Sequence, residues 1–224
     1  MGLPMYFNDN NFNRYDNLDG VEWRVIWALV NSDSKYGKYL WKMLKNNKPD
    51  CLMGDDLSNK EKYKMVYRDN GESTAYKVFM MPFIDDGWTE QSSRLDVYVS
   101  RVSPTNYVSS KVDITIEIIV HNKINNIYGD ADDDENPLTN PTETDEDGNI
   151  LTPSKSRATT MLKCVSAILN GAHIDGVGTL QLNEEVSPYC GARSYVWNNR
   201  NYFGYSVTFS TIMGQVSDNP KFGW

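Results

Sequence analysis

Cysteine and histidine are scarce in this chain, which has three cysteines and two histidines among its 224 residues. Cys51, Cys164 and Cys190 are widely spaced and none belongs to a CxxC pair. The sequence therefore predicts neither a disulfide framework nor a zinc cluster, and we expect all three thiols to be reduced. No metal ion or other cofactor is expected.

Long apolar runs are also absent. No apolar run approaches 18 residues, and the first ten residues lack the basic stretch and apolar core of a secretion signal. We therefore expect no membrane partner and synthesis in the cytoplasm. The glycine pair in Gly176-Val177-Gly178 is too short for a phosphate cradle and has no Walker lysine, so no nucleotide site is predicted.

The two histidines, His121 and His173, are the candidate general bases of the sequence. Either one would have to contact Cys164 or Cys190 for nucleophilic catalysis, which also needs a group that orients the base. No family-specific signature surrounds these residues. We therefore expect a partly exposed histidine, a core-facing Cys164 and no enzymatic activity, with a Cys/His hydrolase as the weaker alternative.

Negative charge is concentrated in one segment. The chain has 22 Lys and Arg against 30 Asp and Glu, a net charge of -8, but residues 129–153 contain nine acidic residues and no basic residue. The rest of the chain is nearly balanced, so this acidic segment is predicted to project from the body, with Asp147-Gly148 at the tip of a β-hairpin. Its candidate partner contacts are Asp130, Asp132, Asp133, Asp134, Glu143, Asp145 and Asp147.

Part of the acidic segment imitates a calcium loop. Glu143, Asp145, Asp147 and Gly148 have the spacing of positions one, three, five and six of an EF-hand, but the twelfth position is Ser154 instead of a bidentate Glu. A solvated acidic hairpin is the preferred interpretation. Basic residues are scattered except along residues 35–48, so specific nucleic-acid binding is not expected either.

The clearest structural signal is the strict alternation of residues 111–123, KVDITIEIIVHNK. It predicts a long strand at the centre of an antiparallel sheet, with an inward face of Val112, Ile114, Ile116, Ile118 and Val120. Asp113, Glu117 and His121 share the other face, where paired carboxylates can act as acid and base or bind a metal. A solvated strand face shows the same alternation, and we prefer that interpretation.

Helical and strand patterns flank this strand on both sides. We expect helices over Asp19–Val30, opened by a capping box of Asp19 and Glu22, from Asp33 or Ser34 to Lys45, and from Ser154 or Ser156 to Asn170. Lys35, Lys38, Lys42 and Lys45 are expected to face outward. Residues 49–71 are predicted to be loop with one short helix. Further strands are predicted at residues 78–83, 94–102, 179–182, 192–197 and 202–213.

These elements predict an α+β fold with helices packed on one face of a mostly antiparallel sheet. We expect one domain over residues 19–213 with the acidic segment as an excursion, an extended amino-terminal arm over residues 1–18, and a carboxy-terminal tail over residues 214–224.

The order of elements carries a resemblance to known proteins. Amino-terminal helices are followed by a strand pair ending in SSKVDITIEIIVHNKI, the excursion, the helix SKSRATTMLKCVSAILNG, and a hairpin ending in NYFGYSVTFSTIM. Over about residues 18–213 this pattern resembles the tail-terminator, tail-completion and neck ring proteins of tailed phages. The Asn- and Tyr-rich style is similar to that of crAss-like phages. The likeness is one of pattern and not of a catalytic motif.

The resemblance implies a structural protein located in the virion neck or tail. It implies a homo-oligomeric ring of six or twelve subunits that joins portal or adaptor proteins to tail proteins and lets double-stranded DNA pass. A non-enzymatic module for host or carbohydrate recognition is the alternative, because the chain has six Trp and 14 Tyr and aromatic side chains often mediate such binding.

Overall fold

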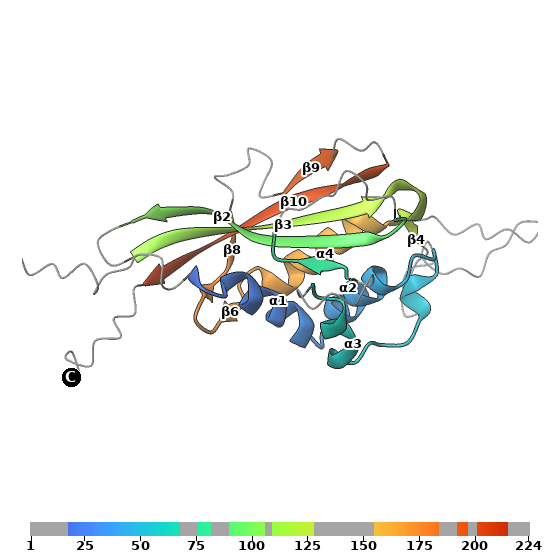
Figure 1. The fold of residues 1–224 in the computed structure, drawn as a ribbon, viewed down its shortest axis with the longest axis horizontal. Helices are drawn as coiled ribbons and strands as arrows, with labels where there is room; N and C mark the ends of the chain where they lie inside the picture. The colour runs from blue at the N-terminus through green and yellow to red at the C-terminus, as the bar shows by residue number, and fades with distance from the viewer. Residues whose placement is uncertain are drawn as a thin grey trace, which may run out of the picture.

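The computed structural model of the protein describes residues 18–67, 76–81, 90–105, 109–127, 155–183, 192–196 and 201–214. Helices α1 (Val21–Asn31), α2 (Lys35–Lys45), α3 (Asn59–Lys64) and α4 (Arg157–Leu169) lie on one side of a mostly antiparallel sheet (Figure 1). The predicted α+β fold class, with helices on one face of the sheet, is confirmed.

The sheet has the strand order β1-β2-β3-β10-β8, where β1 is Val78–Phe79, β2 is Ser93–Pro104, β3 is Ser109–His121, β10 is Tyr202–Gly214 and β8 is Gln181–Leu182. Strand β9 (Ala192–Val196) also pairs with β10. Among the described strands of this sheet, all pairings are antiparallel except that of β1 with β2. The central position of β3 and its hairpin with β2 are as predicted.

The core lies between the sheet and the helices. All five residues of the predicted inward face of β3 are fully buried, as are Val207 and Phe209 of β10. Burying each such side chain contributes about 1.5–3 kcal/mol. The helices supply the facing residues, whose fully buried members include Val25, Ile26, Leu29, Leu40, Trp41, Met161, Val165 and Leu169. Apolar residues of the strands and apolar residues of the helices therefore pack together in one core.

The other face of β3 is not the solvated face that the alternation suggested. Asp113, Thr115 and His121 are buried, although they were expected to face water. Cross-strand partners explain the difference, because side chains of neighbouring strands approach closely enough to hydrogen-bond. The Oγ1 atoms of Thr115 and Thr208 lie 2.9 Å apart, and Asp113 Oδ1 accepts from Ser210 Oγ at 2.5 Å.

The predicted capping box of α1 is wrong. The N-cap residue is Gly20, which has a left-handed φ of 73° and offers no side-chain cap. Glu22 instead accepts a hydrogen bond from the Val99 backbone N–H at 3.3 Å. This bond attaches the first turn of the helix to β2, so Glu22 serves the tertiary fold instead of its own helix.

Helix α2 begins as predicted, with Ser34 Oγ accepting from Gly37 N–H at 3.1 Å. The outward orientation expected for Lys42 is wrong, because only 8 % of this residue is exposed. Its stem is buried, while its Nζ donates to the Leu52 carbonyl at 3.3 Å and lies 2.9 Å from Asp56 Oδ1. A long lysine side chain can bury its methylenes and keep its ammonium group partnered.

The predicted start and end of helix α4 are both confirmed. Ser156 Oγ accepts from Thr159 N–H, and Gly171 follows the helix with a left-handed φ of 81°. The short helix expected in residues 49–71 is α3, which opens with a capping box of Ser58 and Glu61 that sequence reasoning missed. A 3-10 turn, η3 (Cys51–Met53), precedes it, and another, η4 (Asn122–Ile124), follows β3.

The shorter strands differ in extent from their predictions. Strand β1 ends at Phe79, and the predicted continuation from Pro82 lies outside the described residues. The strand expected at residues 179–182 is split into β7 (Gly178–Thr179) and β8, and an unpredicted β6 (His173–Ile174) pairs with β7. The hairpin of β9 and β10 has the predicted antiparallel pairing.

Strand β4 (Asn126–Ile127) pairs with β5 (Lys155–Ser156) on either side of the predicted acidic segment. The acidic segment itself, the amino-terminal arm up to residue 17 and the tail from residue 215 lie outside the described residues. None of the helices in the described part of the chain has the length and apolar composition needed to cross a membrane.

Candidate interaction surfaces

The structure does not place the residues predicted to contact partners. Asp130, Asp132, Asp133, Asp134, Glu143, Asp145 and Asp147 lie outside the described residues, as do the calcium-like spacing and Cys190. Within the described residues, no group of three or more His, Cys, Asp or Glu side chains is placed to hold a metal ion. The surfaces described below were not singled out by sequence reasoning.

Cys164 occupies the core position that was predicted for it. It is 1 % exposed, and burial raises the pKa of its thiol to about 12. Burial likewise raises the pKa of Cys51. Because the thiolate is the nucleophilic form, neither thiol is prepared for nucleophilic attack at neutral pH.

The two histidines lie in different settings. His121 is 6 % exposed, so the partly exposed position expected for it is wrong. Its Nδ1 accepts from Lys123 N–H at 3.1 Å, its ring meets Tyr202 edge to face, and burial lowers its pKa. His173 is exposed, and its Nδ1 lies 3.2 Å from Thr179 Oγ1. Within the described part of the chain, no hydrogen bond joins either histidine to Cys164.

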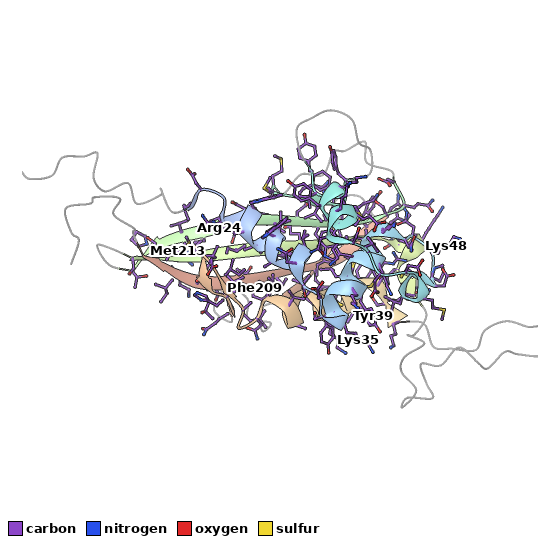
Figure 2. The ribbon with its side chains drawn as sticks, turned by 90° about the horizontal axis from the view of Figure 1, so that it is seen from below. Arg24, Lys35, Tyr39, Lys48, Phe209 and Met213 are labelled. Atoms are coloured by element: carbon purple, nitrogen blue, oxygen red, sulfur yellow. The ribbon has the colours of Figure 1, made fainter. Side chains whose placement is uncertain are left out.

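A groove of about 530 Å³ runs between α2 and α4. We call it the α2–α4 groove. Its lining comes from the start of α2, from β5, and from the exposed side of α4, and includes Lys35, Tyr36, Tyr39, Lys155, Thr159, Thr160 and Lys163. Figure 2 shows Lys35 and Tyr39 close together on the helical side of the molecule.

Three lysines and no carboxylate are among the described residues that line the α2–α4 groove. Lys35 Nζ lies 5.3 Å from the centre of the Tyr39 ring and Lys163 Nζ lies 5.8 Å from that of Tyr36. Cation–π contacts of this length hold ammonium groups over aromatic faces without neutralising their charge.

The remaining lysines of α2 have acidic partners outside the groove. Lys38 and Lys42 lie 2.7 Å and 2.9 Å from the carboxylate of Asp56, and Lys45 lies 3.0 Å from Glu61. Hydrogen bonds from Lys38 and then Lys42 lower the pKa of Asp56 to about 2. Carboxylates of the chain between α2 and α3 and of α3 itself therefore hold Lys38, Lys42 and Lys45.

The groove also contains a buried hydroxyl. The phenolic oxygen of Tyr39 is shielded from solvent and makes no hydrogen bond with any part of the chain that the structure describes. Buried phenols usually find a partner, because the loss of hydration is otherwise uncompensated. Tyr39 therefore has a hydroxyl that is closed off from solvent and that no described group satisfies.

Arg157 fixes the two helices that form the groove. Its guanidinium is fully buried and donates to the carbonyls of Met43 at 2.9 Å, Asn46 at 2.5 Å and Lys48 at 2.8 Å. The Met43 carbonyl lies in the last turn of α2 and the other two lie just beyond it, where a helix end leaves its acceptors unsatisfied and favours a cation. Since Arg157 starts α4 and meets the end of α2, the helices pack antiparallel.

A second surface feature is an aromatic patch of Trp23, Trp27 and Tyr63 on α1 and α3. The three ring centres are 5.6–6.1 Å apart, and Trp27 is 45 % exposed. Ile212, near the far end of β10, is 67 % exposed. Large apolar side chains at such exposure are candidate contacts for other proteins.

Comparison with known proteins identifies the family. The family model YomW matches residues 38–211, more than three quarters of the chain, from α2 through the central strands and α4 into β10. This family is phage-associated. No curated protein and no solved structure matches the chain. The protein therefore belongs to the YomW family of phage-associated proteins.

Proposed function

We propose that this protein is a non-enzymatic structural component of the virion, which forms a ring in the neck and joins portal or adaptor proteins to the tail. The observation that carries the proposal is the exposure of large apolar side chains at several separate places, among them α1 and β10. Trp27 is 45 % exposed on α1 and Ile212 is 67 % exposed on β10. We infer that both are contacts between subunits or with neighbouring virion proteins.

Two different contact surfaces suit a ring better than a two-fold dimer. In a two-fold dimer the same patch meets itself, whereas head-to-tail contacts join two unlike patches and close into a ring when the rotation allows. Met213, next to Ile212 on β10, lies at one end of the long body in Figure 2, and Lys48, after α2, lies at the other. A long body can meet one neighbour at each end.

The family and the charge distribution also support this proposal. The YomW family is phage-associated. Outside residues 129–153 the acidic and basic residues of the chain nearly balance, which favours close packing of subunits. An acidic segment that lined the channel would repel DNA phosphates and let DNA slide past without sticking, whereas an acidic segment outside the ring would meet a tail partner. We therefore expect passage of DNA without specific binding.

A surface-binding module is the second candidate, and the aromatic patch is the observation that favours it. Trp27 is exposed beside Trp23 and Tyr63, and aromatic faces of this kind can stack on sugar rings. In that case Trp27→Ser would abolish glycan binding and leave the oligomeric state unchanged. Titration of the full-length protein against a glycan array separates this candidate from the ring.

Electron microscopy of Trp27→Ser and Ile212→Ser proteins tests the ring. Ile212 is mostly exposed, so its change is expected to cost the fold less than about 1 kcal/mol. Trp27→Ser also removes ring contacts with Trp23 and Tyr63, which contribute about 0.5–1.5 kcal/mol each, so its folding is checked by thermal unfolding. We expect each variant to lose closed rings that the unmodified protein forms alone or with its neck partners. Lys60→Ser, an exposed polar position on α3, is the matched control. Rings that persist in both apolar variants would contradict the proposed contacts.

A further inference from the structure

A histidine caps the turn that follows β3. His121 is the last residue of β3 and the N-cap of η4, and its Nδ1 accepts a hydrogen bond from the Lys123 backbone N–H at 3.1 Å. The first N–H groups of a helical turn have no partner within the turn, so this ring nitrogen satisfies one of them. In a neutral imidazole only the nitrogen without a proton can accept, so Nδ1 is unprotonated and Nε2 carries the hydrogen.

A second proton on the ring is incompatible with this bond. An imidazolium donates from both nitrogens and accepts at neither. A proton on Nδ1 would point at the Lys123 N–H, so either the ring would turn away or the N–H would lose its acceptor. The ring has little room to turn, because His121 is 6 % exposed and its ring centre lies 5.0 Å from that of Tyr202, edge to face. Protonation therefore opens the cap.

The charges on the same stretch of chain do not favour the cation. Burial and then the nearby Lys123 ammonium lower the pKa of His121 below its ordinary value of 6.5. The carboxylate of Glu117 lies on the same face of β3 but four residues away, about 13 Å along the strand, and accepts from the Tyr98 hydroxyl at 3.0 Å. The closed cap is therefore complete above pH 6.5 and loses stability as the pH falls through the folded pKa.

The neighbouring elements do not supply a carboxylate that is reserved for the ring either. The titratable and charged residues that they place around this end of β3 are Lys77, Glu90, Arg94, Asp96 and Tyr202. Both carboxylates of this set already form ion pairs with basic residues of the set, at 2.6 Å and 2.5 Å. The Tyr202 hydroxyl donates to the Glu90 backbone carbonyl at 2.9 Å.

The turn that His121 caps holds the start of α4. Asn125 closes η4, with its N–H donating to the Asn122 carbonyl at 3.3 Å. The Asn125 carbonyl accepts from the Arg157 N–H at 2.6 Å, and its Oδ1 accepts from the Ala158 N–H at 3.2 Å. These two N–H groups belong to the first turn of α4 and have no partner within that helix. A change in η4 therefore reaches α4 directly.

We propose that His121 is an acid-sensitive cap, whose protonation opens η4 and loosens the start of α4. The inference goes beyond the proposed ring, because it concerns a single chain and holds whether or not copies associate. Strand β4 follows η4 and its partner β5 precedes α4, with the acidic segment between these two strands. Acid therefore also loosens the β4–β5 pair from which the acidic segment leaves the body.

Hydrogen exchange of the full chain, measured by NMR at about pH 7.5 and about pH 5, tests the inference on both sides of the histidine pKa. The protection factors of the Lys123, Arg157 and Ala158 amides, which correct for the intrinsic effect of pH on exchange, should fall at the lower pH. The fall is at most about tenfold for each pH unit that separates the pKa values of the open and closed states. The Ile116 amide, in the centre of β3, should stay more strongly protected than these three at both pH values, as a local opening requires.

Two matched variants assign the effect to one ring. His121→Asn keeps a side-chain acceptor that is favoured at N-caps and does not titrate, so the protection of the three amides should be equal at both pH values. His173→Asn changes the other histidine of the chain, which is exposed on β6, and should keep the fall. The His173→Asn protein has a single histidine, so its ring signals also report the pKa of His121, which should lie below 6.5.

The outcomes decide the inference separately from the ring. A fall in the wild-type and His173→Asn proteins that is absent from His121→Asn supports the acid-sensitive cap. Protection that does not change with pH in the wild type, a fall that persists in His121→Asn, three amides protected as strongly as Ile116, or a ring pKa at or above 6.5 overturns it. A chain that stays monomeric with every neck partner contradicts the ring and leaves the acid-sensitive cap standing.

Discussion

Arg157 is the side chain whose loss should reveal most about how the helical layer is held. The variant Arg157→Met keeps an apolar stem and removes three hydrogen bonds to carbonyls at and beyond the end of α2. The bond to Met43 is fully buried, so its carbonyl is left unsatisfied at a cost of about 2 kcal/mol. The bonds to Asn46 and Lys48 are part-buried and contribute about 0.5–1 kcal/mol each.

The expected loss is therefore about 3–4 kcal/mol, a large part of the roughly 5–15 kcal/mol that keeps a typical domain folded. Urea unfolding followed by tryptophan fluorescence measures it, because Trp41 is fully buried next to this region. The control is Arg24→Met, since Arg24 is exposed and makes one bond, to the Asp175 carbonyl at 2.9 Å. A loss below about 1 kcal/mol for Arg157→Met, or one no larger than the control's, would refute the role assigned to this guanidinium.

Four further predictions concern the fold and the charges. Gly204→Ala should destabilise the protein by about 1–3 kcal/mol in the same urea assay, because a Cβ at this position would collide with the Ile118 backbone carbonyl across the β10–β3 pair. Unchanged stability would show that β10 and β3 can move apart enough to accept the methyl group. Asp56 has a folded pKa of about 2, below its ordinary value of 3.8, so its contribution to folding stability is present above about pH 4 and is lost as the pH falls towards 2. In acid titrations followed by circular dichroism, Asp56→Asn should remove this loss of stability between about pH 4 and about pH 2. An acid profile unaltered by the substitution would contradict the pairing of Asp56 with Lys38 and Lys42. Replacing residues 129–153 with a short Gly-Ser linker should preserve cooperative thermal unfolding while weakening assembly, and non-cooperative unfolding would reject this expectation. Millimolar calcium should shift the melting temperature of the unmodified protein only slightly, and a large shift would reject that expectation.

The sequence predicted the sheet well because burial and strand period act together there. The inward face of β3 consists of β-branched residues at every second position, and such a pattern has one stable arrangement in a half-buried sheet. The opposite face was misjudged for a physical reason. Asp113 and Thr115 are polar, as residues facing water would be, but side chains of β10 satisfy their hydrogen bonds and cover them. A polar side chain on a strand can face water or a cross-strand partner, and its polarity alone does not show which.

Sequence patterns could not predict the α2–α4 groove. Its walls come from α2 and α4, which are separated by more than 100 residues, and its charge depends on which lysines of α2 meet Asp56 or Glu61. Helical periodicity placed the α2 lysines on one outer face and did not separate the buried Lys42 from the groove-lining Lys35. One signal was available in the sequence: Arg157 opens an apolar helix, where a cation is unfavourable unless another helix end accepts it.

The proposed ring is tested most directly by electron microscopy and mass photometry of the purified full-length protein, alone and mixed with its portal and tail partners. The account predicts a closed ring of six or twelve subunits, formed alone or on a partner as template. A persistent monomer in every mixture, or an open filament without closed rings, would contradict the proposed neck function.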